Sequence, residues 1–204
     1  MQLIDPVTGA NSGWQAAFAD NDMVTLVVDG VTDDAVFIQK FADFTGPVGP
    51  GGIFRPINIT FTQTLGDAAT VPNIVINDEA VTNLTGSDWG GFNWILGSHD
   101  NGNEAWFNIP LSSGFDTTPF NNQSYDTVPG NPNRGNALRT TGGTVVNLDT
   151  FFPGAGPGEL WISVDLSVAT VTSFTFKEQP VPEPATLALL AGAGLMALRR
   201  TRLR

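Results

Sequence analysis

Short runs of alternating apolar and polar residues, bounded by Gly, Pro, Asn or Asp, follow one another along most of the chain. The clearest is INITFT, residues 57–62, in which Ile57, Ile59 and Phe61 share one face and polar residues occupy the other. This two-residue period is typical of a half-buried strand. Further strands are predicted by eight other runs: 23–29, 35–41, 73–77, 92–96, 104–109, 144–148, 160–166 and 173–177.

About nine short strands separated by turns predict an all-β domain, an antiparallel β-sandwich or jelly roll. The only helix-like stretch before the C-terminal end is GWQAAFAD, residues 13–20, which is long enough for one or two turns. Two segments rich in Gly, Pro or Asn, 46–52 and 116–136, are predicted to be loops. The chain has 23 Gly and 14 Pro, in keeping with many tight turns.

The charge of the chain is distributed unevenly. Residues 1–180 have a net charge of −14, whereas residues 181–204 have a net charge of +3, within a total of −11. Such an acidic body repels the phosphates of nucleic acids, so we expect no nucleic-acid partner. The chain has no cysteine, which excludes disulfides, thiolate nucleophiles and zinc–thiolate sites.

The last 24 residues have a different pattern from the body. ATLALLAGAGLMAL, residues 185–198, has no charge and no polar face, and Arg199, Arg200, Arg202 and Arg204 follow it. A helix of this length spans about 21 Å, less than the roughly 30 Å of a bilayer core, but the arginines can extend the span by reaching the headgroups. Arginines beyond an apolar segment favour the cytoplasmic side, so we expect a single-pass helix with the body outside.

Three regions are therefore expected: a β-domain at 1–178, a Pro-rich linker at 179–184, and a transmembrane helix with a basic tail at 185–204. Pro182, Glu183 and Pro184 lie in the linker. Prolines disfavour both a helix and strand pairing, so we expect this segment to be extended and accessible.

A Pro-Glu-Pro motif, a short apolar helix and an arginine cluster at the C-terminal end resemble the PEP-CTERM sorting signal of Gram-negative and related bacteria. The resemblance covers about 24 of the 204 residues. It implies that Pro182, Glu183 and Pro184 are recognised by exosortase, a membrane-embedded cysteine peptidase or transpeptidase, and that the tail is removed near the motif. It also implies an exported protein, held in the membrane before processing and then at the cell surface or outside the cell, associated with exopolysaccharide and biofilm.

The first residues, MQLIDPVTGANSGW, lack the basic start and apolar run of a secretory signal. Because the resemblance implies export through such a signal, we expect either an upstream start that supplies one or targeting by the C-terminal segment itself.

The body offers few residues for catalysis. A triad would have to use His99, the single histidine, with Asp100 and a serine such as Ser98, Ser112 or Ser113, and no nucleophile-elbow motif is present. A glycosidase needs two carboxylates about 5–10 Å apart, and the five glutamates do not form a recognisable cluster in the sequence. We therefore expect a protein that is not an enzyme.

Two binding sites remain open. The segment DNGNE places Asp100, Asn101, Asn103 and Glu104 around a glycine, and calcium prefers such oxygen ligands, although these residues are also common in plain turns. Calcium is thus a possible cofactor, and no other cofactor is expected.

Sugar binding is the second open site, because exposed aromatic rings can stack on sugars. Trp89 lies in the turn-like GSDWGG, and Trp161 lies opposite the apolar face of its predicted strand, so we expect both rings to be exposed. Core packing is the alternative for each ring. The sequence thus predicts an exported cell-surface or extracellular-matrix protein, with a carbohydrate-binding module of the exopolysaccharide matrix as the alternative.

Overall fold

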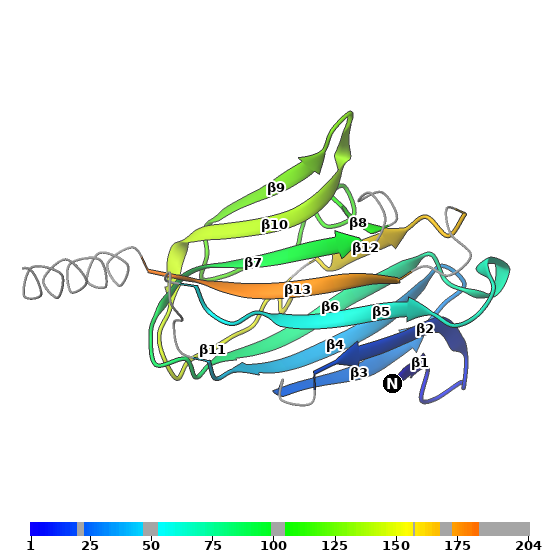
Figure 1. Cartoon of the computed structure of the whole chain (residues 1–204), viewed down its shortest axis with the longest axis horizontal. Coiled ribbons are helices and arrows are strands. Elements are labelled where there is room, and N and C mark those ends of the chain that lie inside the picture. Colours follow the sequence, from blue (N-terminus) through cyan, green and yellow to red (C-terminus); the bar gives the residue numbers. More distant parts are fainter. Residues whose placement is uncertain (20–22, 47–52, 99–104, 157, 168–172, 184–204) are drawn as a thin grey trace, which may run out of the picture.

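The computed structural model describes residues 1–19, 23–46, 53–98, 105–156, 158–167 and 173–183. These residues form an all-β, barrel-like sandwich, which confirms the all-β sandwich part of the predicted fold class (Figure 1). Among them the one helix is a short 3₁₀ turn, η1 (Asp67–Ala69). The predicted apolar helix at 185–198 lies outside the described residues, and within those described no helix is long and apolar enough to cross a membrane.

The strands join into one highly curved sheet in the order β1-β2-β5-β13-β7-β10-β8-β12-β6-β4-β3, with β9 beside β10 and β11 beside β6. Their bounds are β1 (Gln2–Ile4), β2 (Asn11–Phe18), β3 (Met23–Val31), β4 (Ala35–Phe44), β5 (Ile57–Gln63), β6 (Asn73–Asn83), β7 (Trp89–Ser98), β8 (Ala105–Asn108), β9 (Asn122–Val128), β10 (Asn131–Val145), β11 (Thr150–Phe151), β12 (Leu160–Val164) and β13 (Ser173–Pro182).

The sheet folds into two layers that are joined at one side and nearly closed at the other. One layer contains β1, β2, β5, β13, β7 and β10, and the other contains β8, β12, β6, β4 and β3 (Figure 1). The long strand β10 pairs with β7 and with β8, which joins the layers. At the opposite side, the backbone N–H of Val31 at the end of β3 donates to Asp5 Oδ2, just after β1, over 3.3 Å.

The sequence predicted an antiparallel sheet, and this prediction is wrong for one pair of strands. β4 and β6 pair in parallel, from Ala35 opposite Asn73 to Phe44 opposite Asn83. Two parallel strands need a crossover between them, and here β5 leaves for the other layer before the chain returns as β6. Local alternation contains no information about the direction of a neighbouring strand, so this pair could not be predicted from it.

Aromatic and branched aliphatic side chains fill the space between the layers. Ile57, Ile59 and Phe61 are buried on one face of β5, as their alternation predicted. Phe174 and Phe176 of β13 are fully buried, also as predicted. Burial of large aromatic side chains is a major source of stability in a sandwich of this kind.

The prediction of a short helix at 13–20 is wrong, because residues 13–18 belong to the strand β2. Trp14 and Ala16 point into the core with the two-residue period of a strand. Gly13 has a φ of +83°, and a Cβ there would clash with Thr70. The tight packing of β2 against Thr70 therefore requires glycine at position 13. The alanines of this segment favour a helix locally, but pairing with neighbouring strands holds them in a strand.

The predicted loop at 116–136 is also wrong over most of its length. Residues from Asn122 onward form the hairpin of β9 and β10, with Gly130 at φ +80° in the turn. β9 is exposed and polar along most of its length, so it has no alternation to detect. Pairing with β10 holds it in place. The run predicted at 144–148 is only the end of β10, which stops at Val145.

Candidate functional site

The chain leaves the domain through β13, and the first part of the Pro-Glu-Pro motif belongs to that strand. The linker expected at 179–184 is therefore partly wrong, since residues 179–182 pair with β7 and Pro182 lies opposite Trp89. β13 pairs with β5 only as far as Glu178. Beyond that point no strand among the described residues pairs with that side of β13, and prolines are tolerated where a strand has an unpaired edge.

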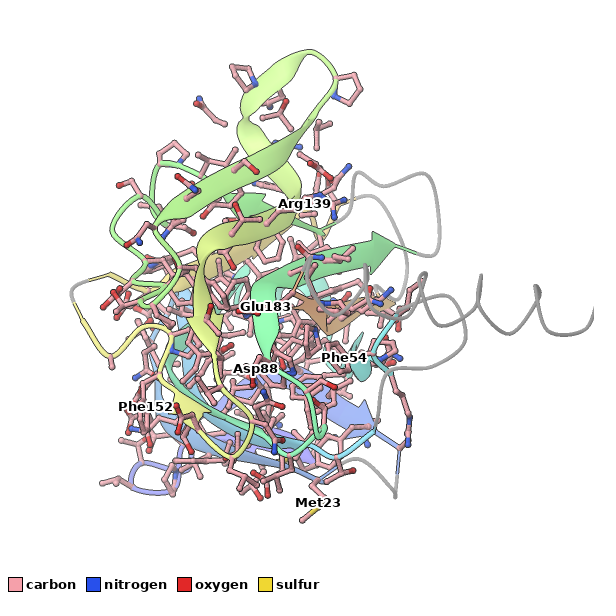
Figure 2. All side chains as sticks on the ribbon, turned by 90° about the vertical axis from the view of Figure 1, so that its left-hand side faces the viewer. Met23, Phe54, Asp88, Arg139, Phe152 and Glu183 are labelled. Atoms are coloured by element: carbon pink, nitrogen blue, oxygen red, sulfur yellow. The ribbon has the colours of Figure 1, made fainter. Side chains whose placement is uncertain are left out.

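Glu183 is held against the same end of the domain. Its backbone N–H donates to the Asp88 carbonyl over 3.4 Å. Its Oε1 accepts a hydrogen bond from Thr144 Oγ1 over 2.6 Å. Figure 2 faces this end of the molecule and labels Glu183 close to Asp88. Pro184, the predicted helix and Arg199, Arg200, Arg202 and Arg204 lie outside the described residues.

Trp89 is not available for a sugar. The predicted exposure is wrong, because the side chain is completely buried. Its ring packs edge-on against Phe44, with centroids 5.4 Å apart, and its Nε1 donates to Thr85 Oγ1 over 3.1 Å. Trp89 begins β7, and a register shift between it and Gly91 places its side chain on the same inner face as Phe92, so it is a core residue.

Trp161 is half-buried on the outer face of β12. Its ring meets Phe37 edge-on at 6.1 Å, and its Nε1 donates to Glu159 Oε2 over 3.0 Å. On the neighbouring strand β8, Trp106 lies under the guanidinium of Arg134, whose Cζ is 3.6 Å from the ring centroid. Strand register places Trp106 opposite Ser163, so both tryptophans belong to one outer face.

The other residues predicted for sites fall mostly outside the described part of the chain. This is true of Asp100, Asn101, Asn103 and Glu104, and of His99. Within the described residues there is no group of three or more His, Cys, Asp or Glu side chains placed to hold a metal ion. Ser112, a nucleophile in the triad considered above, is buried, and its Oγ accepts a hydrogen bond from the Trp161 backbone N–H.

A hollow of about 410 Å³ lies next to the motif. Thr144, the hydrogen-bond partner of Glu183, lines it together with Phe152 and two carboxyl groups, Asp116 and Asp149. Hydrogen bonds from the backbone and the hydroxyl of Thr118 lower the pKa of Asp116. Asp116 is thus suited to accept hydrogen bonds as an anion rather than to deliver a proton as a general acid.

A second cluster, which sequence reasoning missed, lies in the centre of the core. The side chains of Lys40, Glu79 and Glu178 are completely buried. Lys40 Nζ is 2.8 Å from Glu178 Oε2 and 3.8 Å from Glu79 Oε2. Trp94 Nε1 donates to Glu79 Oε2 over 3.3 Å. We refer to these four residues as the buried cluster.

Both layers contribute to the buried cluster. Lys40 of β4 and Glu79 of β6 lie opposite each other in the parallel pair. Glu178 of β13 and Trp94 of β7 lie opposite each other in the other layer. The Trp94 ring is packed among Phe92, Phe115 and Phe151, so aromatic side chains line the cluster on one side.

Burial sets the protonation of the buried cluster. It is the main reason why the pKa of Glu79 is raised well above its ordinary 4.5, with the charge of Lys40 opposing it. Burial also lowers the pKa of Lys40, but the charges of Glu178 and Glu79 more than offset this, and the net change is upward. The raised pKa of Glu79 favours its neutral, protonated form beside the Lys40 ammonium.

Because the cluster is completely buried, it cannot meet a dissolved substrate, and any reaction there is confined to its own side chains. The sequence pattern could have indicated the burial of two members of this cluster, Lys40 and Glu178. Glu178 continues the inward face of Phe174 and Phe176, and Lys40 continues that of Ile38, so period-two counting places two charged residues inside the core.

No family model matches the chain, and no curated protein matches it.

Proposed function

We propose that this chain is an exported cell-surface or extracellular-matrix protein whose C-terminal segment is an exosortase sorting signal. In this proposal residues 185–204 hold the chain in the membrane, with the arginines inside, until the enzyme cuts near Pro182–Pro184. The β-domain then remains at the surface or in the matrix. The observation that supports it best is the sequence of motif, apolar run and arginines at one end of the chain.

The position of β13 fits this proposal. As far as Glu178, β13 is flanked by β5 and β7, and its last residues, 179–182, continue along β7 alone. Tension applied through the motif would therefore act on one ladder of hydrogen bonds at residues 179–182 and on two ladders from Glu178 inward.

Variants at the motif test the proposal. In a host with the matching exosortase, and with an export signal fused to the N-terminus, wild type should yield a shortened surface form. Glu183→Ala should stay in the membrane at full length, because insertion depends on the apolar run and the arginines rather than on this carboxylate. Gel mobility of the membrane and surface fractions distinguishes the two species.

Thr144→Val is the matched control, because it removes the hydrogen bond to Glu183 but leaves the motif intact. We expect it to be shortened like wild type. Full-length membrane species for wild type as well as for Glu183→Ala would mean that the tail is a plain anchor. Replacing Arg199, Arg200, Arg202 and Arg204 with Ser should instead abolish the membrane-held form itself.

A second candidate function is polysaccharide binding on the outer face around Trp161, where two half-buried tryptophans, Trp161 and Trp106, lie on neighbouring strands. Half-buried rings next to charged groups suit sugars, which have both apolar faces and hydroxyls. Binding of the purified protein to a glycan array, compared with Trp161→Ala, tests it. Retention of wild type and weakened retention of the variant are expected; no retention of wild type would reject this function.

A further inference from the structure

Lys40 and Glu178 form a close contact in a completely buried site. Nζ and Oε2 are only 2.8 Å apart, yet within the described residues neither atom makes a contact with the angles of a hydrogen bond. Glu178 Oε1 and Glu79 Oε1 also lack hydrogen bonds there. Buried charged groups are normally hydrogen-bonded, and leaving them without partners is costly. The dry core thus holds an amine and a carboxyl group in close contact, with no room for water between them to stabilise their charges.

We propose that Lys40 and Glu178 condense into an intramolecular amide (isopeptide) bond, with Glu79 transferring the protons. The product joins β4 in one layer to β13 in the other. It replaces two buried charges with one neutral amide, which removes the cost of burying an ion pair. This inference rests on the buried cluster alone and does not depend on the proposed sorting function.

The reaction balances without an oxidant or any other reactant. The Nζ ammonium gives one proton to the Glu178 carboxylate beside it, and the freed lone pair attacks Cδ of Glu178 to form the Cδ–N bond. One Cδ–O bond then breaks, and that oxygen leaves with two of the three ammonium protons as water. The third proton stays on the amide nitrogen. An ammonium and a carboxylate thus become an amide and one water molecule.

Glu79 is placed to transfer those protons. Its Oε2 is 3.8 Å from Lys40 Nζ, and the indole N–H of Trp94 holds that oxygen in position. Because burial raises its pKa, Glu79 begins as a neutral acid that can protonate the departing oxygen and recover a proton from the amine. A group that holds a proton in a dry site and lies next to both reactants is suited to general acid–base catalysis.

Glu178, rather than Glu79, is assigned as the partner that reacts. Its oxygen is the closer of the two to Nζ, and both of its oxygens lack hydrogen bonds within the described structure. Glu79 Oε2 is held by Trp94. An attack on Glu79 would also join two strands that are already neighbours, whereas the Lys40–Glu178 bond links the two layers.

Mass spectrometry of the full chain, unfolded after purification, is the test. We expect the intact mass to be lower than the sequence mass by one water molecule. After proteolysis, a branched peptide should contain both Lys40 and Glu178. Loss of water with a linear Lys40 peptide would point instead to a succinimide, for example at Asp29–Gly30, and would overturn the proposal. So would the full sequence mass, or a branch between Lys40 and Glu79.

Variants test the part played by Glu79. Glu79→Gln should keep the full mass, because an amide cannot transfer the protons. Glu159→Gln is the matched control: Glu159 also accepts an indole N–H, from Trp161, but lies outside the core, so this variant should lose water like wild type. A folded Glu79→Gln protein that contains the bond would refute the role of Glu79.

Trp94→Phe provides a second test in case Glu79→Gln does not fold, as judged by its near-ultraviolet circular dichroism. It keeps an aromatic ring but lacks the N–H that holds Glu79. We expect the branched peptide to form more slowly than in wild type after refolding. Formation at the wild-type rate would contradict the assigned role of Glu79.

Discussion

Trp89 and Trp161 differ in burial, and so in what they contribute to the protein. Trp89 is enclosed by the Phe44 and Phe54 rings, whereas Trp161 is half-buried on the outer face. We expect Trp89→Ala to lower the free energy of unfolding by about 3–5 kcal/mol, the usual range for a large aromatic side chain removed from a core. Trp161→Ala should cost clearly less. Urea unfolding of both variants measures this, and equal losses would contradict the assigned burial.

At the scale of residues, the sequence predicts inward positions but not which of them meet. Lys40 and Glu178 continue the apolar faces of their strands, so their burial follows from the two-residue period of a β-strand. Glu79 does not, because a register shift in β6 after Ile76 moves it to the inner face. A bulge of one residue reverses the direction of every later side chain. The buried cluster could therefore not be assembled from periodicity alone.

At the scale of elements, Asp5 helps to hold the two ends of the sheet together. Its Oδ1 accepts the backbone N–H groups of Val7 and Thr8, and its Oδ2 accepts that of Val31 at the end of β3. The bonds from Thr8 and Val7 are the main reason why the pKa of Asp5 is lowered below its ordinary 3.8. In Asp5→Asn the amide nitrogen cannot accept a hydrogen bond from Val31, so the contact between β1 and β3 should weaken.

The lowered pKa gives this contact a pH dependence. A carboxyl group whose pKa is lower in the folded state stabilises the protein above the unfolded value, and this stability is lost as pH falls through the folded value. Asp5→Asn should therefore lower the urea midpoint at pH 7, and the difference from wild type should vanish as pH falls below 3.8 and through the lowered pKa. The comparison of midpoints from pH 7 to 2 checks this. A difference that does not change with pH would contradict it.

The elements that the sequence predicted well are those with their own alternation, such as β5 and β13. Those it predicted wrongly depend on their partners. β2 is a strand because it packs beside β5, and β9 is a strand because it pairs with β10. β13 can continue through Pro180 and Pro182 because its pairing with β5 ends at Glu178. The position where this pairing ends is known only from the register of the sheet.

At the scale of the whole molecule, the proposed cross-link lies on β13, the strand that would attach the domain under the proposed function. β13 contains Glu178 and leads directly to Glu183. An amide bond from Glu178 to Lys40 would join the attachment strand covalently to the opposite layer. Tension applied through the C-terminal end would then be borne by a covalent bond as well as by hydrogen bonds. A protein displayed outside the cell, with no cysteine for disulfides, would gain stability from such a bond.

The central claim is that the tail is a sorting signal removed at the motif. The most direct measurement is the identity of the C-terminal peptide of the surface form, recovered from an exosortase host and read by mass spectrometry. A peptide that ends within or next to Pro182–Pro184, with residues 185–204 missing, is the result we predict. A surface form that still contains Arg199–Arg204 would contradict the claim.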